Sequence, residues 1–291
     1  MSQAPPAQRA SLPAQSPAEP EGPGSRLRAG WTSVHEGLHA EWTKLRTLPG
    51  TPWLVAAIIA ATVAVSTAAV AAATCPSGGC TVDPTKLSLT GTDLGQAVVA
   101  ILAVLTISSE YSTGMIRTTL TAMPRRGTVL AAKATVITGL VLAAGTIAVL
   151  GSLLAGALIL PRHGFTPAHG YPPLSLGDGP VLRAAAGTVL YLALIALLSL
   201  GVATIIRDSG AAIGTVLGLL YLSPIIGAVV TSPHWHNGIE RYAPMSAGLA
   251  IQATTGLRGL PISPWGGLGV LAAWAAAALL AGGLLLRLRD A

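Results

Sequence analysis

The chain has 291 residues, of which 52% are hydrophobic and only 10% are charged. A typical soluble domain carries about 25% charged residues, so this composition excludes an ordinary water-soluble globular protein. The net charge is +6, and the basic residues lie beside long apolar runs rather than in one basic tract. This distribution favours a membrane protein over a nucleic-acid-binding protein.

The first 30 residues are rich in Pro, Ala, Ser and Gln. Such a segment buries too little apolar surface to offset the entropy lost on ordering, so residues 1–30 are predicted to form a disordered tail. The first apolar run is long enough to span a membrane, so we expect a retained anchor rather than a signal peptide. Residues 31–291 are then expected to form a single transmembrane domain.

Six apolar runs reach the length of about 20 residues that a helix needs to cross a bilayer. They predict an all-α integral membrane protein. The second run is the shortest and spans the bilayer only if its helix continues past Ser109. Asp208, in the turn after the fourth run, is expected to cap the fifth helix. The six runs are Pro52–Ala73, Thr92–Ser109, Ala134–Leu160, Arg183–Ile206, Gly210–Thr231 and Trp265–Leu286.

The basic residues predict the orientation of these spans, because short cytoplasmic loops carry the excess of Lys and Arg. With the N-terminus inside, five basic residues remain outside: Lys86, Arg162, Arg183, Arg241 and Arg258. The larger inside set is Arg26, Arg28, Lys44, Arg46, Arg117, Arg125, Arg126, Lys133, Arg207, Arg287 and Arg289. We therefore expect a multi-pass protein of the plasma membrane with both termini in the cytoplasm.

Cys75 and Cys80 are the only cysteines and flank a short Gly-containing loop after the first span. On the extracytoplasmic side such a loop can close a disulfide, and two free thiols are the alternative. Small residues recur at every fourth position in three spans and predict close helix contacts. The row Gly210, Gly214 and Gly218 is expected to mark an interface. Two alanine rows suggest others: Ala60, Ala64, Ala68 and Ala72, and Ala273, Ala277 and Ala281.

Two polar stretches next to spans carry the remaining information. In the first, Trp42 and Leu45 suit lipid while Lys44 and Arg46 suit headgroup phosphates, so Glu41, Trp42, Lys44 and Arg46 predict an amphipathic interfacial helix before the first span. The second begins at Glu110, where the second span ends, and runs to Lys133. It is either a basic loop that only fixes topology or a short cytoplasmic helix that receives force from a partner.

Two histidine patterns are candidate metal sites. His35, Glu36 and His39 form an H-E-x-x-H motif, which on a helix can bind zinc with the glutamate as general base. The motif precedes a span instead of lying inside one, so a membrane zinc metallopeptidase is the alternative interpretation and an interfacial helix the simpler one. His234 and His236 can face one way only in an extended segment, and Trp235 between them favours an interfacial anchor.

No lysine of the chain completes a phosphate-binding loop, because Lys44, Lys86 and Lys133 are followed by Leu45, Leu87 and Ala134. Any ATP-driven activity would need a second polypeptide that binds ATP and Mg²⁺. We therefore expect no enzyme activity and no cofactor in this chain.

At the two polar stretches the chain resembles the permease subunits of type-2 ATP-binding-cassette exporters. An E-x-x-K-L-R-T element before the first span is matched by Glu41, Lys44, Leu45, Arg46 and Thr47. A second pattern between the second and third spans is matched by Glu110, Tyr111, Gly114, Ile116, Arg117, Thr119, Leu120, Pro124, Arg125, Arg126 and Lys133. The resemblance extends from Glu41 to the C-terminus.

The resemblance implies an exporter built from two permease chains, identical or related, and two ATPase subunits. Residues 117–126 would form the coupling helix that contacts the ATPase, and residues 41–48 the connecting helix. The coupling residues would be Glu110, Gly114, Arg117, Thr119, Leu120, Pro124, Arg125 and Arg126. The resemblance also implies short half-helices on the extracytoplasmic side, within residues 240–260, with breaks at Pro244 and Gly256. A structural membrane protein without an ATPase partner remains an alternative.

Overall fold

The computed structural model describes residues 38, 41–47, 50–75, 82–114, 126–229 and 232–288, and within these ranges it contains helices and no strand. Six described helices are long and apolar enough to cross a membrane. The protein is therefore an all-α membrane protein with six spans, as predicted. The long helices are α2 (Gly50–Ala72), α4 (Thr92–Ser112), α6 (Arg126–Ile159), α7 (Gly179–Ile206), α8 (Ser209–Val229) and α11 (Pro264–Leu288).

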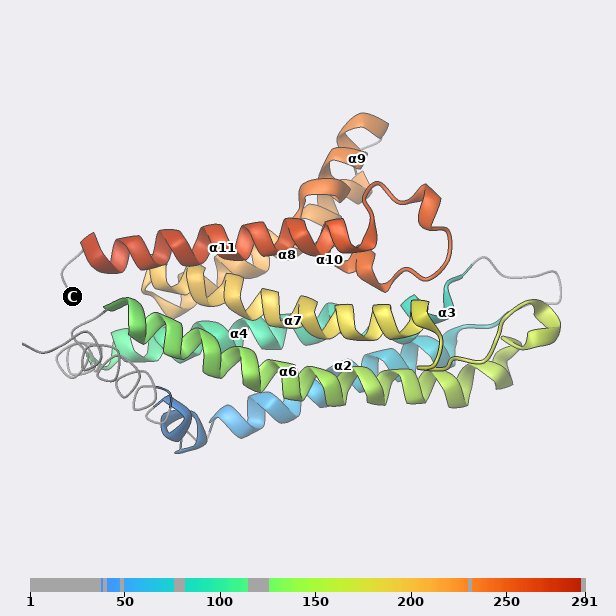
Figure 1. The fold of residues 1–291 in the computed structure, drawn as a ribbon, viewed down its shortest axis with the longest axis horizontal. Coiled ribbons are helices and arrows are strands. Elements are labelled where there is room, and N and C mark those ends of the chain that lie inside the picture. Colours follow the sequence, from blue (N-terminus) through green and yellow to red (C-terminus); the bar gives the residue numbers. More distant parts are fainter. Residues whose placement is uncertain are drawn as a thin grey trace, which may run out of the picture.

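The long helices run alternately up and down the long axis of the molecule (Figure 1). A helical segment at residues 41–47 precedes α2, and the end of α11 lies at the same end of the bundle. We call this the 41–47 end. Short elements gather toward the opposite end: α3 (Pro84–Ser88), η1 (Leu160–His163), η2 (Pro167–His169), α9 (Pro233–Tyr242), α10 (Pro244–Leu249), η3 (Ala250–Gln252) and η4 (Leu257–Gly259).

The helix bounds settle two details of the predicted spans. The second span does continue past Ser109, because α4 ends at Ser112 and Gly114 then turns the chain with φ of 71°. Helix α6 has 34 residues, which at 1.5 Å per residue gives about 51 Å. That length exceeds a hydrocarbon core of about 30 Å, so α6 extends beyond the bilayer or lies tilted in it.

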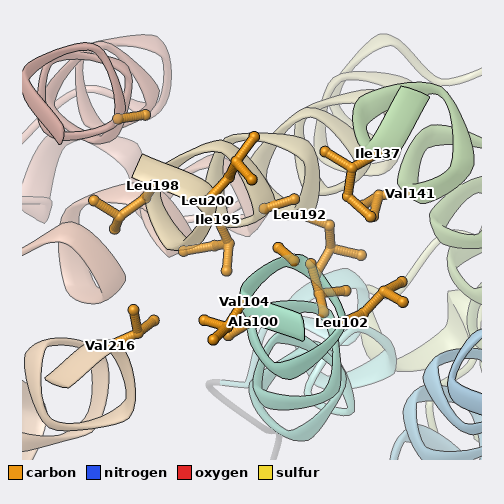
Figure 2. Packing of buried hydrophobic residues seen from close by; sticks show 14 of the residues in the cluster. Ala100, Leu102, Val104, Ile137, Val141, Leu192, Ile195, Leu198, Leu200 and Val216 are labelled. Carbon is orange, nitrogen blue, oxygen red and sulfur yellow. The ribbon is translucent and has the colours of Figure 1, made fainter. Parts of the chain in front are cut away.

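Helix α7 lies at the centre of the bundle and packs against α4, α6, α8 and α11. Its buried face contributes Leu192, Ile195, Leu198 and Leu200 to the main apolar cluster, which Figure 2 shows between the helices. Within a bilayer such helices are held together by the close packing of these side chains, because lipid tails are as apolar as the helix interface. Only 22% of the most apolar window of each of α2, α8 and α11 is buried inside the described structure, as expected for helices that face lipid.

The small-residue rows do not mark the helix contacts inside the described part of the chain. In α2 the alanine row is exposed, and the helix packs instead through Ile58, Thr62, Ser66 and Val70. The alanine row of α11 is exposed too, and Gly282 provides the close contact with Gly201 of α7. A Cβ added at Gly214 or Gly218 would meet no described atom within 4 Å, so the glycine row of α8 forms no interface with the described helices.

Asp83 joins two distant segments at the end opposite the 41–47 end. Its carboxylate caps α3 by accepting hydrogen bonds from the backbone N–H groups of Thr85 and Lys86. It also accepts hydrogen bonds from the backbone N–H groups of Thr254 and Thr255 and from the Thr254 hydroxyl. Burial raises the pKa of the Asp83 carboxyl, but these hydrogen bonds outweigh burial and leave the pKa below its ordinary value.

Candidate functional site

Three segments bring four charged side chains together at the 41–47 end. Glu41 and Lys44 lie three residues apart on the 41–47 helix and so share one face of it. Glu110 lies in the last turn of α4, and Lys133 lies two turns into α6. We call Glu41, Lys44, Glu110 and Lys133 the charge cluster. It connects the segment before the first span to the ends of the second and third spans.

Lys133 occupies the centre of the charge cluster. Its Nζ lies 2.7 Å from Oε2 of Glu41 and 2.8 Å from Oε1 of Glu110. It also donates a hydrogen bond of 3.3 Å to the carbonyl oxygen of Thr106. The Nζ of Lys44 lies 2.9 Å from Oε1 of Glu110 and 3.2 Å from Oε1 of Glu41. Each lysine therefore bridges both carboxylates, and the four formal charges cancel.

Three of the four side chains in the charge cluster are buried, so breaking their contacts is costly in free energy. The side chain of Lys133 is 1% exposed and those of Glu41 and Glu110 are 5% and 4% exposed, whereas that of Lys44 is 36% exposed. Removing one partner from a buried ion pair costs about 3–5 kcal/mol, because an unpaired charge stays in a medium of low polarity. The cluster therefore holds its three segments in one arrangement.

The pKa of Lys44 is shifted by its two carboxylate neighbours. Burial lowers the pKa of its ammonium, but hydrogen bonds and charge interactions with Glu110 and Glu41 outweigh burial and leave the pKa above its ordinary value. A raised lysine pKa stabilises the fold at every pH below the unfolded value of about 10.4, and the contribution disappears as the pH rises through the folded value. Lys44 is thus fully charged near neutral pH.

The orientation expected for the 41–47 helix is wrong for two of its residues. Lys44 turns toward Glu110 instead of toward headgroup phosphates. Leu45 is buried and lines a hollow of about 190 Å³ with Leu54 of α2 and Leu102 of α4. Trp42 and Arg46 are exposed. The apolar face of this helix therefore packs on the protein, because α2 and α4 leave a complementary surface there.

The turn between α7 and α8 lies beside the charge cluster. The guanidinium of Arg207 lies 5.3 Å from the centre of the Tyr111 ring, next to Glu110 in the chain, a distance within reach of a cation–π attraction. Arg207 ends α7 with φ of 62°, and Asp208 accepts a hydrogen bond of 2.8 Å from the backbone N–H of Ala211. The predicted cap of the fifth span by Asp208 is confirmed.

Several residues of the expected coupling segment lie outside the described residues: Arg117, Thr119, Leu120, Pro124 and Arg125. The structure places the residues on either side of them. Glu110 and Gly114 lie at the end of α4, and Arg126 is the first residue of α6. Glu110 and Lys133 of the charge cluster therefore belong to the two helices that flank residues 115–125 in the chain.

The described residues include only part of the predicted metal sites and of the predicted disulfide. His35, Glu36 and His39 lie outside the described residues, and no described residues form a group of three or more His, Cys, Asp or Glu that could hold a metal. His234 and His236 lie on a helix, α9, where positions i and i+2 do not face each other. Cys75 is disulfide-bonded, and because Cys80 lies outside the described residues, their pairing stays a prediction.

In comparisons with known proteins, no family model matches the chain and no curated protein matches its sequence.

Proposed function

We propose that this chain is the membrane-spanning permease subunit of a type-2 ATP-binding-cassette exporter, driven by a separate ATPase in the cytoplasm. The observation that supports the proposal best is the charge cluster. Its four residues belong to the two motifs on which the resemblance to these permeases depends, and in the fold they contact one another. Two separate sequence motifs thus form one structural unit.

The cluster suggests how force would pass through the chain. A partner that pushes on residues 115–125 would move the ends of α4 and α6 that flank them. Glu110 and Lys133 would then carry the motion to Glu41 and Lys44, and so to the helix that leads into α2. Buried, paired charges suit this role because they resist separation. The spans would tilt as connected units rather than one by one.

The exposed helices leave room for the second permease chain that the proposal requires. A Cβ at Gly214 or Gly218 of α8 would meet no atom of the described helices, and Leu222 and Ile225 on the same helix are 55% and 59% exposed. In a bilayer such faces meet lipid or another helix. The ATPase would bind ATP and Mg²⁺. The permease would lie in the plasma membrane with both termini in the cytoplasm.

Purification of the full-length chain with its ATPase tests the proposal. The complex should hydrolyse ATP, and the double variant Arg117→Ala/Arg125→Ala should lose most of the co-purified ATPase without a change in unfolding temperature. Arg162→Ala, at the opposite end of the bundle in η1, is the matched control and should keep the complex intact. Wild-type amounts of ATPase and wild-type hydrolysis in the double variant would contradict the proposal, as would an ATPase-free chain that still performs transport.

A further inference from the structure

A cavity of about 310 Å³ lies at the end of the bundle opposite the charge cluster. Its wall comes from α3, the start of α4, the last third of α8, the end of α9, α10, η3 and the loop at residues 260–262. Pro224 lies inside α8 at this level and leaves the carbonyl of Leu220 without its helical donor. The hydroxyl of Ser223 donates a hydrogen bond of 3.1 Å to that carbonyl. The cavity is thus built from four separate stretches of chain.

The lining combines charge with an apolar wall. Asp93 and Glu240 supply two carboxylates, and Lys86 supplies one ammonium group. Glu240 is also 3.4 Å from the imidazole of His236, whose Nδ1 lies 2.9 Å from the backbone oxygen of Gly227 in α8. Thr90, Ser246 and Gln252 add uncharged polar groups, and the apolar part of the wall includes Met245, Leu249, Leu260, Pro261 and Ile262. The formal charge of the lining is −1, which favours a cation in the cavity.

Gln252 provides a second and independent sign of a ligand. It lines the cavity and is 3% exposed, and its side-chain Nε2 has no hydrogen-bond partner among the described residues. Most buried polar groups are hydrogen-bonded, because a buried donor without an acceptor costs about 1–3 kcal/mol. An oxygen atom of a bound molecule would satisfy this amide.

We infer that the cavity binds an organic cation that also carries an acceptor oxygen and an apolar group. The cationic nitrogen pairs with Asp93 and Glu240, the oxygen accepts hydrogen bonds from Gln252 and Lys86, and the apolar group lies against Leu249 and Ile262. The inference concerns this chain alone and does not depend on an ATPase partner. Its test is therefore separate from the test of the proposed function.

Four small probes dissect the three features, with binding to the full-length chain in lipid nanodiscs measured by calorimetry. At about pH 6, below the ordinary α-amino pKa of about 7.7, L-phenylalaninamide has the ammonium, the carbonyl oxygen and the apolar ring, and it should bind. 3-Phenylpropanamide lacks the ammonium and phenethylamine lacks the carbonyl, and each should bind about tenfold more weakly, the loss expected for one hydrogen bond to a charged group. N-Acetyl-phenylalanine, an anion, should not bind.

Variants assign each loss to a residue. Gln252→Met should lower the affinity for L-phenylalaninamide about tenfold and leave that for phenethylamine unchanged. Asp93→Asn and Glu240→Gln should each weaken both amines and leave 3-phenylpropanamide unchanged. Asp178→Asn removes a carboxylate at the start of α7 that does not line the cavity, and it should change nothing. Equal binding of all four probes, tighter binding of the anion, or an unchanged profile in Gln252→Met would overturn the inference.

Discussion

At the scale of single residues, the fold depends on a few polar side chains that join segments far apart in sequence. Lys133 is the clearest case, because its ammonium lies between two buried carboxylates. Asp83 plays the corresponding part at the opposite end, where its carboxylate accepts hydrogen bonds from α3 and from residues 254–255. Each of these two residues holds distant segments of the chain at one relative position through directional polar contacts.

Replacing Lys133 by Met should lower the free energy of unfolding by about 3–5 kcal/mol, because Glu110 and Glu41 would stay buried with only Lys44 to balance them. The double variant Lys133→Met/Glu110→Gln restores the charge balance. Its loss should be at least about 1 kcal/mol smaller than the sum of the single losses. Unfolding titrations in detergent measure all three.

The control is Arg46→Met, on the exposed face of the 41–47 helix, which should change the stability by less than about 0.5 kcal/mol. Strictly additive losses in the double variant would show that Lys133 and Glu110 do not act as a pair.

The contribution of Asp83 to the stability of the fold should decrease as the pH is lowered. Because its folded pKa lies below the unfolded value of about 3.9, its contribution is present above about pH 4 and is lost as the pH falls through the folded value. Asp83→Ala should cost about 1–3 kcal/mol at pH 7. The difference from wild type should shrink below about pH 4 in thermal unfolding scans.

The matched control is Asp178→Ala, since Asp178 precedes α7 without a side-chain capping hydrogen bond. It should leave the unfolding temperature almost unchanged at every pH. A difference between Asp83→Ala and wild type that stays constant from neutral pH down through the acid range would contradict the assignment.

At the scale of helices, glycine positions decide which helices approach closely. A Cβ at Gly91 would lie 1.9 Å from the backbone oxygen of Thr62 in α2, whereas one at Gly214 of α8 would meet no described atom within 4 Å. The backbone N–H of Gly91 also donates a hydrogen bond of 3.0 Å to the Ser66 hydroxyl. The start of α4 therefore rests directly on α2.

Gly91→Ala should destabilise the protein by about 1–3 kcal/mol, because α2 would have to shift. Gly214→Ala, the same chemical change at an open position, should leave the stability unchanged or raise it slightly. Thermal unfolding of the two variants side by side measures the difference. Equal unfolding temperatures would show that α2 and α4 do not pack as closely as the structure places them.

The helices themselves could be predicted from the sequence because apolar length alone defines a span. Which face of each helix packs could not. The alanine row of α2 and the row through Thr62 and Ser66 have the same spacing of four, and in a chain so rich in small residues the spacing does not distinguish them.

The charge cluster was also only half predictable. The motifs singled out Glu41, Lys44, Glu110 and Lys133 separately, but the pairing of Glu41 with Lys133 depends on how the 41–47 helix folds back on the bundle. The contact of Asp83 with residues 254–255 joins positions about 170 apart in the chain. No local pattern in the sequence encodes it.

At the scale of the whole molecule, the proposal places the charge cluster on the cytoplasmic side. In a Cys75→Ser/Cys80→Ser background, a cysteine at Ser112 or Ser209 should react with a membrane-impermeant maleimide only after the cells are opened. A cysteine at Asp178, beyond the other end of the spans, should react in intact cells. The reverse pattern would place residues 115–125 outside and remove them from any cytoplasmic ATPase.

The two ends of the bundle then have different tasks in the proposed cycle. The charge cluster would receive motion from the ATPase, while the cavity beside Gln252 lies at the far end of α4 and α8. Helix α4 connects them, since it carries Asp93 in its first turn and Glu110 in its last. A tilt of α4 would therefore change both sites together.

The most direct test of the proposed function is a photo-crosslinking amino acid placed at position 120 of the full-length chain in its native membrane. The proposal predicts a crosslinked product that contains an ATPase with a phosphate-binding loop, and none from the same amino acid placed at position 178. Crosslinks to lipid alone at position 120, or an ATPase captured from position 178 instead, would contradict it.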